Sequence, residues 1–298
     1  MKRRDNTRVL PASIALMMVL ALGVSACSFQ TSDRTASSPS HESAAVATST
    51  ATVSTRKAAS TMANQVAAQP LHEAPLADAT DTGAGSLTGR TVYLDPGHAG
   101  TPPPQDLLVT DGRGGLKPCN TSGTASNDGF PEHEFNWLMA QEIKSLLEQR
   151  GATVLLSRSD DTGRADCIDA RAEKENASGA DAVVSLHADG AGEGNRGFHV
   201  SSIDAPMAAN DAGGSAKLAE ALRDALVSGG FSTSNYLGVD GLNPRADLTG
   251  LNLSTRPKAL IEYGNMRDSA DIALLASEDG RRRLAEATVA GIEVFLGA

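Results

Sequence analysis

Short apolar segments alternate with longer segments of helical pattern between residues 90 and 298, and this alternation constrains the fold more than any other feature. Four apolar runs have the length of buried strands: residues 91–94, 152–156, 182–186 and 259–262. Four longer segments have the spacing or composition of helices: residues 131–150, 167–177, 215–227 and 281–295. Near-continuous apolar strands separated by helices are typical of a largely parallel sheet with both faces covered. The sequence therefore predicts a single α/β domain with a mostly parallel twisted sheet and helices on both faces.

The residues before this pattern have a different composition. Basic residues precede an apolar run from Pro11 to Val24, which is shorter than the roughly 20 residues of a membrane span. Small residues follow, and the segment from Val24 to Cys27 resembles the bacterial lipobox, in which the cysteine is acylated. We therefore expect a lipoprotein signal peptide at residues 1–26, export, and lipidation of Cys27 as a membrane anchor. An ordinary signal peptide with an incidental cysteine is the alternative.

From residue 27 to residue 88 the chain is rich in Ser, Thr and Ala and has few large apolar side chains. This composition predicts a disordered tether, followed by a folded domain at residues 89–298. Two further cysteines, Cys119 and Cys167, lie in that domain. Because disulfides persist in the oxidising compartments that exported proteins reach, we expect this pair to form one; two buried free thiols are the alternative.

Three of the apolar strands lead into a residue that can bind a metal or transfer a proton: His98, His187 and Glu262. The carboxyl ends of parallel strands converge on one crevice, so we expect these side chains to meet. Glu132, in the first turn of the helix at 131–150, is a fourth candidate. Two imidazoles and one carboxylate form the ligand set of hydrolytic zinc sites, and a further carboxylate can act as general base. The spacing alone leaves open which glutamate is the ligand and which is the base.

Four segments, in this order along the chain, resemble the motifs of a known family: Leu94–His98 (LDPGH), Glu132–Asn136 (EHEFN), Ser185–Asp189 (SLHAD) and Leu260–Met266 (LIEYGNM). The family is that of the zinc-dependent N-acetylmuramoyl-L-alanine amidases, amidase_3, and the cysteine pair resembles its compact mycobacterial-type members. The resemblance implies one Zn²⁺ ion bound by His98, Glu132 and His187, with Glu262 as the catalytic glutamate.

The register of the second motif selects Glu132 over Glu134 as the ligand, because Asn136 falls four residues after Glu132. Ala99 and Trp137 depart from the glycine and leucine that many members have there. Neither is a ligand position, so these departures do not predict loss of activity.

The resemblance implies a hydrolase that cleaves the amide bond between N-acetylmuramic acid and L-alanine in peptidoglycan, in cell-wall hydrolysis, remodelling or daughter-cell separation. Two alternatives are another zinc peptidase of the envelope that cuts within the stem peptide and a non-catalytic wall-binding module.

The expected partners are peptidoglycan and, through Cys27, a membrane, and we expect a monomer. The formal net charge of −10 argues against nucleic acid as a main partner, because phosphate binding needs a basic surface. Arg245, Asp247 and Asn252 lie in a loop before the last strand and are candidate substrate contacts. His199 lies in a strand-like run and is interpreted as structural.

Overall fold

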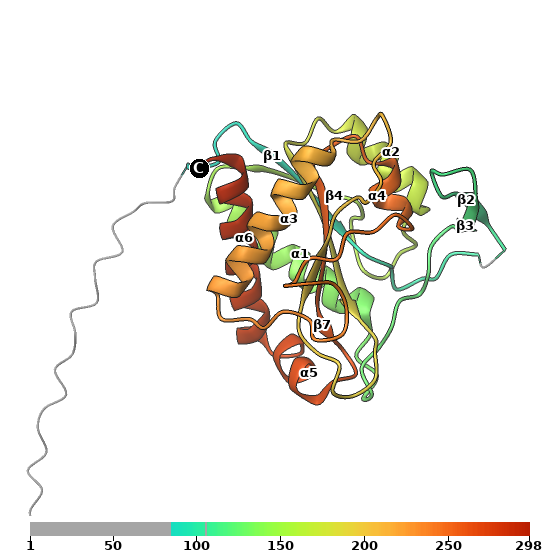
Figure 1. The fold of residues 1–298 in the computed structure, drawn as a ribbon. Helices are drawn as coiled ribbons and strands as arrows, with labels where there is room; N and C mark the ends of the chain where they lie inside the picture. The colour runs from blue at the N-terminus through green and yellow to red at the C-terminus, as the bar shows by residue number, and fades with distance from the viewer. Residues whose placement is uncertain (1–84, 105) are drawn as a thin grey trace, which may run out of the picture. The chain divides into compact units, whose positions relative to one another are not determined.

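The computed structural model describes residues 85–104 and 106–298, which contain a five-stranded sheet in the order β4-β1-β5-β7-β6. The strands are β1 (Thr91–Pro96), β4 (Thr153–Leu156), β5 (Ala182–Asp189), β6 (His199–Ser201) and β7 (Lys258–Asn265). The first four in spatial order run parallel, and β6 pairs antiparallel with β7 at one edge. The predicted mostly parallel α/β sheet is thereby confirmed (Figure 1).

Helices cover both faces of the sheet. One face packs against α1 (Glu132–Gln149), α3 (Ala212–Ser228) and α6 (Glu278–Leu296). The other carries α2 (Ile168–Ala177) and α4 (Thr249–Leu253), while α5 (Ser269–Leu275) packs beside β7 and α6. Since side chains along a strand alternate between the two faces, each strand contributes side chains to the packing against both helical layers.

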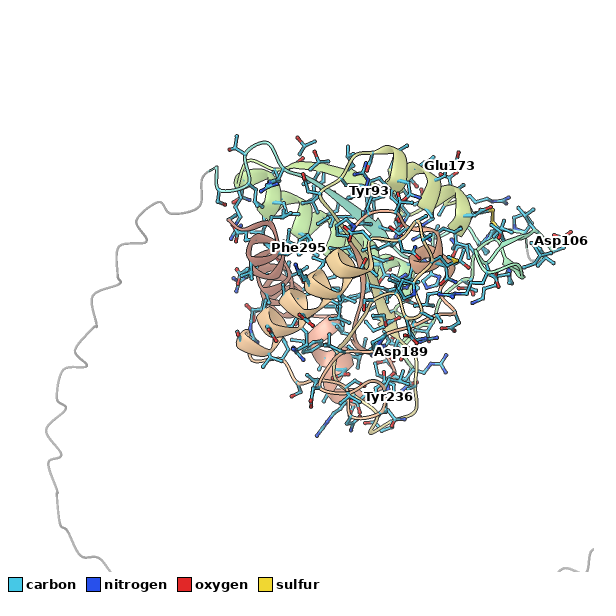
Figure 2. The ribbon with its side chains drawn as sticks, turned by 45° about the horizontal axis from the view of Figure 1, so that its top comes forward. Tyr93, Asp106, Glu173, Asp189, Tyr236 and Phe295 are labelled. Atoms are coloured by element: carbon cyan, nitrogen blue, oxygen red, sulfur yellow. A yellow bond between two sulfur atoms is a disulfide. The ribbon has the colours of Figure 1, made fainter. Side chains whose placement is uncertain are left out.

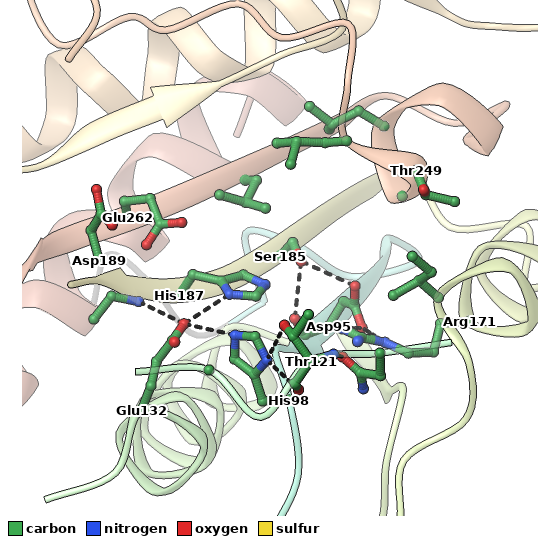
Figure 3. Close-up of a pocket in the computed structure, with 18 of the residues that line it drawn as sticks. Asp95, His98, Thr121, Glu132, Arg171, Ser185, His187, Asp189, Thr249 and Glu262 are labelled. Atoms are coloured by element: carbon green, nitrogen blue, oxygen red, sulfur yellow. Dashed lines mark hydrogen bonds and ion pairs between the residues drawn. The ribbon is translucent and has the colours of Figure 1, made fainter. Parts of the chain in front are cut away.

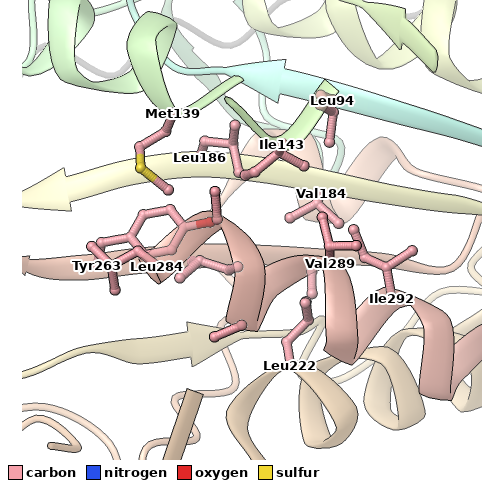
Figure 4. Close-up of a cluster of buried hydrophobic side chains, with 14 of the residues drawn as sticks. Leu94, Met139, Ile143, Val184, Leu186, Leu222, Tyr263, Leu284, Val289 and Ile292 are labelled. Atoms are coloured by element: carbon pink, nitrogen blue, oxygen red, sulfur yellow. The ribbon is translucent and has the colours of Figure 1, made fainter. Parts of the chain in front are cut away.

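The main hydrophobic core lies between the sheet and the layer of α1, α3 and α6 (Figure 4). Leu94, Val184 and Leu186 point into it from the sheet and are fully buried. Full burial of such a side chain contributes about 1.5–3 kcal/mol, so this face holds the sheet in place. The alternate positions Asp95, Ser185 and His187 must then point to the opposite face, towards α2.

A small hairpin that the sequence analysis did not predict projects beside the domain. It consists of β2 (Leu108–Thr110) and β3 (Leu116–Pro118), strands too short to give a periodic signal, and Figure 2 shows the adjoining loop at Asp106. The structure joins Cys119, directly after β3, to Cys167 at the start of α2 by a disulfide with an S–S distance of 2.02 Å. This is the pair expected from the sequence, and it connects the hairpin to the helical layer.

The ordered domain begins before residue 89, the boundary expected from composition. Leu87 is fully buried in the main core, and its backbone N–H donates to the Arg150 carbonyl at 2.9 Å. Residues 85–88 therefore belong to the fold, because one apolar side chain anchors them. The expected signal peptide, Cys27 and nearly all of the expected tether lie outside the described residues. Within the described part of the chain, no helix is both long and apolar enough to cross a membrane.

Candidate metal centre

The parallel strands β1, β5 and β7 bring three polar residues to one edge of the sheet. His187 and Glu262 are register partners on β5 and β7, and His98 follows β1 by two residues. His98 has a φ of 59°, in the left-handed region, which turns the chain sharply at this point. The turn also needs Gly97: a Cβ there would lie 2.1 Å from His187 Cε1, so only glycine lets the two histidines approach.

His98, Glu132 and His187 form a cluster in which the three candidate ligand atoms all lie within 4.8 Å of one another. Glu132 Oε1 is 3.1 Å from His98 Nε2 and 2.9 Å from His187 Nδ1 (Figure 3). The two imidazole rings meet edge to face, with centroids 4.9 Å apart and planes at 88°. Two ring nitrogens and one carboxylate oxygen thus face a common point, which fits a single divalent ion.

Glu132 begins α1, where backbone N–H groups favour a negative charge. Its Oε2 accepts a hydrogen bond from the Thr124 backbone N–H at 2.9 Å, and Asn136 Nδ2 donates to Oε1 at 3.4 Å one helical turn further on. Although burial opposes ionisation, hydrogen bonds with His187 and His98 lower the pKa of Glu132 well below its usual range. Glu132 is buried in the cluster whereas Glu134 is exposed, and the choice of Glu132 as the metal ligand stays a prediction.

The loop from residue 119 to residue 124 fixes the ring of His98. The Thr121 carbonyl lies 2.8 Å from His98 Nδ1 and can accept its proton, so Nε2, on the side of Glu132, is the nitrogen that would bind a metal ion. Gly123, with a φ of 77°, lies so close that a Cβ there would be 2.7 Å from both Glu132 Oε2 and His98 Cδ2. The loop residues Thr121, Gly123 and Thr124 therefore position the ligands, and no sequence periodicity reveals them.

Glu262 faces the same cavity from β7 but has a different environment. The cavity has a volume of about 480 Å³ and is lined by the three clustered residues, Glu262 and Asp189, among others. Burial, with the nearby carboxylates of Glu132 and Asp189, raises the pKa of Glu262 well above that of an ordinary glutamate. Figure 3 shows Glu262 and Asp189 close together beside His187. A carboxyl group with a raised pKa beside a candidate metal ligand set is suited to proton transfer.

A network of buried charges lies beneath the metal cluster and was not anticipated from the sequence. Arg171 donates to Asp95 Oδ1 from Nε at 2.8 Å, and Ser185 Oγ donates to Asp95 Oδ2 at 3.0 Å. Lys258 forms ion pairs with Glu175 at 2.5 Å and with Asp95 at 3.6 Å. Burial alone would raise the pKa of Asp95, but Arg171 and Lys258 lower it well below its usual range. The network fixes β1, β5 and β7 to α2 under the cluster.

The three candidate substrate contacts lie outside the set of residues that line the cavity. Arg245 and Asp247 pair with each other through two contacts of 2.7 Å. Asn252 is 2% exposed, donates to the Asp111 carbonyl at 2.9 Å and accepts from Arg113 Nε at 3.0 Å. Asn252 thus connects α4 to the loop at 111–115 through these hydrogen bonds, and substrate contact by Asn252 stays a prediction. For Arg245 and Asp247 substrate contact stays a prediction.

The chain is similar to a known family of proteins. The family model described as N-acetylmuramoyl-L-alanine amidase (Amidase_3) matches residues 92–294. The N-acetylmuramoyl-L-alanine amidase Rv3717 of Mycobacterium tuberculosis is 41% identical over 223 residues, which cover 74% of this chain and 92% of that protein.

Solved structures agree. The crystal structure of the N-acetylmuramyl-L-alanine amidase Ami1 of Mycobacterium smegmatis is 42% identical and superposes with a TM-score of 0.69, over 71% of this chain and 98% of that one. The apo form of Ami1 from Mycobacterium abscessus is 44% identical with a TM-score of 0.69, over 70% of this chain and all of that one. With the ligand cluster at the strand ends, these matches show that the chain belongs to the Amidase_3 family of N-acetylmuramoyl-L-alanine amidases, the family that its four sequence motifs predicted.

Proposed function

We propose that this amidase hydrolyses the bond between N-acetylmuramic acid and L-alanine with one Zn²⁺ ion held by His98 Nε2, His187 Nδ1 and Glu132, and with Glu262 as general base. The observation that carries this proposal is the convergence of the three donor atoms within 4.8 Å, next to a cavity that Glu262 also lines. Two imidazoles and one carboxylate would be the protein ligands, which is the ligand set of hydrolytic rather than structural zinc sites.

The chemistry divides between the bound ion and the side chains. Zinc would supply Lewis acidity and lower the pKa of water to about 7. Glu262 would accept a proton from the water that attacks the amide carbonyl carbon. It would then deliver that proton to the nitrogen of L-alanine as the carbon–nitrogen bond breaks, which leaves a lactyl carboxylate and a peptide with a free amine.

The two glutamates support this division of roles by their environments. Glu132 accepts hydrogen bonds from the Thr124 backbone and from Asn136. These bonds stabilise the ionised carboxylate, which is the form that binds a metal ion. The environment of Glu262 raises its pKa, as is typical of a carboxyl group that transfers protons in an active site.

Membership of a cell-wall amidase family indicates an exported protein that acts on peptidoglycan. We extend the proposal to an N-terminal signal at residues 1–26, a lipid anchor at Cys27 and a Ser/Thr/Ala-rich tether leading to a monomeric catalytic domain. A flexible tether of about 60 residues reaches roughly 45 Å on average, which suits an enzyme held at a membrane and acting on a polymer at some distance. Metabolic labelling with a palmitate analogue tests the anchor: labelling should be lost in Cys27→Ser.

Product analysis of purified muropeptides tests the proposed reaction. The expected products are an intact stem peptide with a free L-alanine amine and a peptide-free glycan, with about one zinc ion per chain. Fragments cut within the stem peptide would indicate a different envelope peptidase. Undiminished function of Glu262→Ala would indicate a wall-binding module and would contradict the proposal.

A further inference from the structure

His199 lies beside Glu262 in the sheet. In the antiparallel pair of β6 and β7, His199 and Glu262 are register partners, and on the other side of β7 Glu262 is the partner of His187. Side chains of directly opposed residues point to the same face, with Cβ atoms about 4.5–5.5 Å apart. The three residues therefore form a row across β5, β7 and β6, and Glu262 stands between the two imidazoles.

Two polar atoms in this row are buried without a partner. His199 is 2% exposed, and neither its Nδ1 nor Glu262 Oε2 has a hydrogen-bond partner among residues 85–104 and 106–298. A buried polar group without a partner is destabilising, so two such atoms on residues paired across β6 and β7 require an explanation. The pair is chemically complementary, because an imidazole Nδ1–H donates and a carboxylate oxygen accepts.

The surroundings of His199 restrict its ring. Tyr236 meets it edge to face, with centroids 6.4 Å apart and planes at 90°. The Tyr236 hydroxyl in turn donates to Asp189 Oδ2 at 2.9 Å, and Asp189 lines the cavity beside Glu262. The His199 ring is thus packed against a side chain that is itself hydrogen-bonded to a residue of the cavity.

We propose that His199 is a positioning residue for Glu262: its Nδ1–H donates to Glu262 Oε2 and so holds the other carboxylate oxygen towards the metal ligands. This inference rests on the proposed role of Glu262 as general base. The register of β6 and β7 sets the two residues side by side, and the bond would give both unpartnered atoms a partner. The hydrogen bond would also favour the ionised carboxylate that a base needs. His199, interpreted as structural from the sequence alone, then acts on the reaction through Glu262.

Substitutions that move or remove the donor distinguish this role from a packing role. In His199→Asn the side-chain amide N–H lies close to the position of Nδ1, whereas in His199→Gln it lies close to the position of Nε2. His199→Leu keeps much of the volume and removes the donor. A residue that only fills the core would tolerate leucine at least as well as either amide.

Steady-state hydrolysis of a purified muropeptide by the full chain, with the zinc content of each variant, tests the proposal. We expect His199→Asn to retain kcat within about threefold, and His199→Gln and His199→Leu to lose about 10- to 100-fold in kcat, the usual effect of removing an orienting partner. KM and zinc content should not change. Should the leucine variant fail to fold, the difference in kcat between the asparagine and glutamine variants still tests the positioning role.

Equal kcat in all three variants, equal losses in the asparagine and glutamine variants, or a loss confined to KM or zinc content would overturn the role of His199. Glu262→Ala, assayed in parallel, separates this failure from that of the proposed function. An active Glu262→Ala enzyme contradicts the general base itself. If Glu262→Ala is inactive but the three His199 variants have equal kcat, only the positioning role of His199 is contradicted.

Discussion

Glu132 and Glu262 face the same cavity from opposite sides of His187, yet the fold treats the two carboxylates in opposite ways. Glu132 sits at a helix N-terminus among several hydrogen-bond partners, and its pKa is lowered. Glu262 sits in mid-strand with one oxygen unpartnered, and its pKa is raised. Residue type therefore does not define the role of either glutamate. The partners that surround a carboxylate decide whether it stays charged as a ligand or exchanges protons.

Replacement of a proposed histidine ligand should have the largest effect on hydrolysis, because the proposed zinc ion would be lost. We expect His187→Ala to lose bound zinc and to reduce hydrolysis to the background of the assay. Elemental analysis after dialysis and a muropeptide assay measure the two quantities. A matched control is His133→Ala, since the His133 imidazole pairs with Asp161 at 2.9 Å outside the ligand cluster. Full zinc occupancy in His187→Ala would contradict the ligand assignment.

Glu262→Gln should separate the two carboxylates most clearly. Without a base, kcat should fall by about 10²–10⁴-fold, the usual contribution of general acid–base catalysis. Zinc content should stay at that of the wild type, because Glu262 is not one of the clustered ligands. If this variant lost its zinc, Glu262 would have to be a ligand and the comparison with Glu132 would fail.

Glu132→Gln should weaken zinc binding while Glu134→Gln should not. The amide cannot supply the charge of the ligand, whereas Glu134 is exposed two residues away on the same helix. Competition with a chelator gives the zinc dissociation constant of each variant. We expect a rise of about 10- to 100-fold for Glu132→Gln, with the Glu134 variant as the matched control. Equal constants in the two variants would show that the register argument chose the wrong glutamate.

The pH dependence of kcat/KM should show the smallest effect. Glu262 must be ionised to accept a proton, so activity should fall as the pH decreases through its pKa. Because that pKa is raised, the fall should begin at a higher pH than for an ordinary glutamate. Asp189→Asn removes one neighbouring negative charge that raises this pKa. It should therefore shift the acid limb to lower pH by about one unit or less, and an unchanged limb would contradict the coupling.

Much of the fold, and the approach of the two histidines, could be predicted because both depend on local sequence. The strands that precede His98 and His187 are continuous apolar runs, and parallel strands place their carboxyl ends at one edge. The choice of Glu132 came from the resemblance to the family motif, in which an asparagine follows the glutamate by four residues, and in the structure Asn136 donates to Glu132.

The rest depends on contacts between distant segments. Arg171 binds Asp95 across 76 residues of sequence, and Lys258 binds Glu175 across 83. Because these partners are so far apart, no sequence periodicity predicts the buried charge network. Asn252 donates to the Asp111 carbonyl across 141 residues, a contact that its position in a polar loop does not predict. The short strands β2 and β3 also contain too few residues for a recognisable alternation.

Anomalous diffraction at the zinc absorption edge, from crystals of the zinc-loaded protein, tests the central claim most directly. We expect one peak bound by His98 Nε2, His187 Nδ1 and Glu132, with zinc–nitrogen distances of about 2.0–2.1 Å and Glu262 facing the open side. A peak that includes Glu262 among its ligands, or no peak within reach of the two histidines, would contradict it.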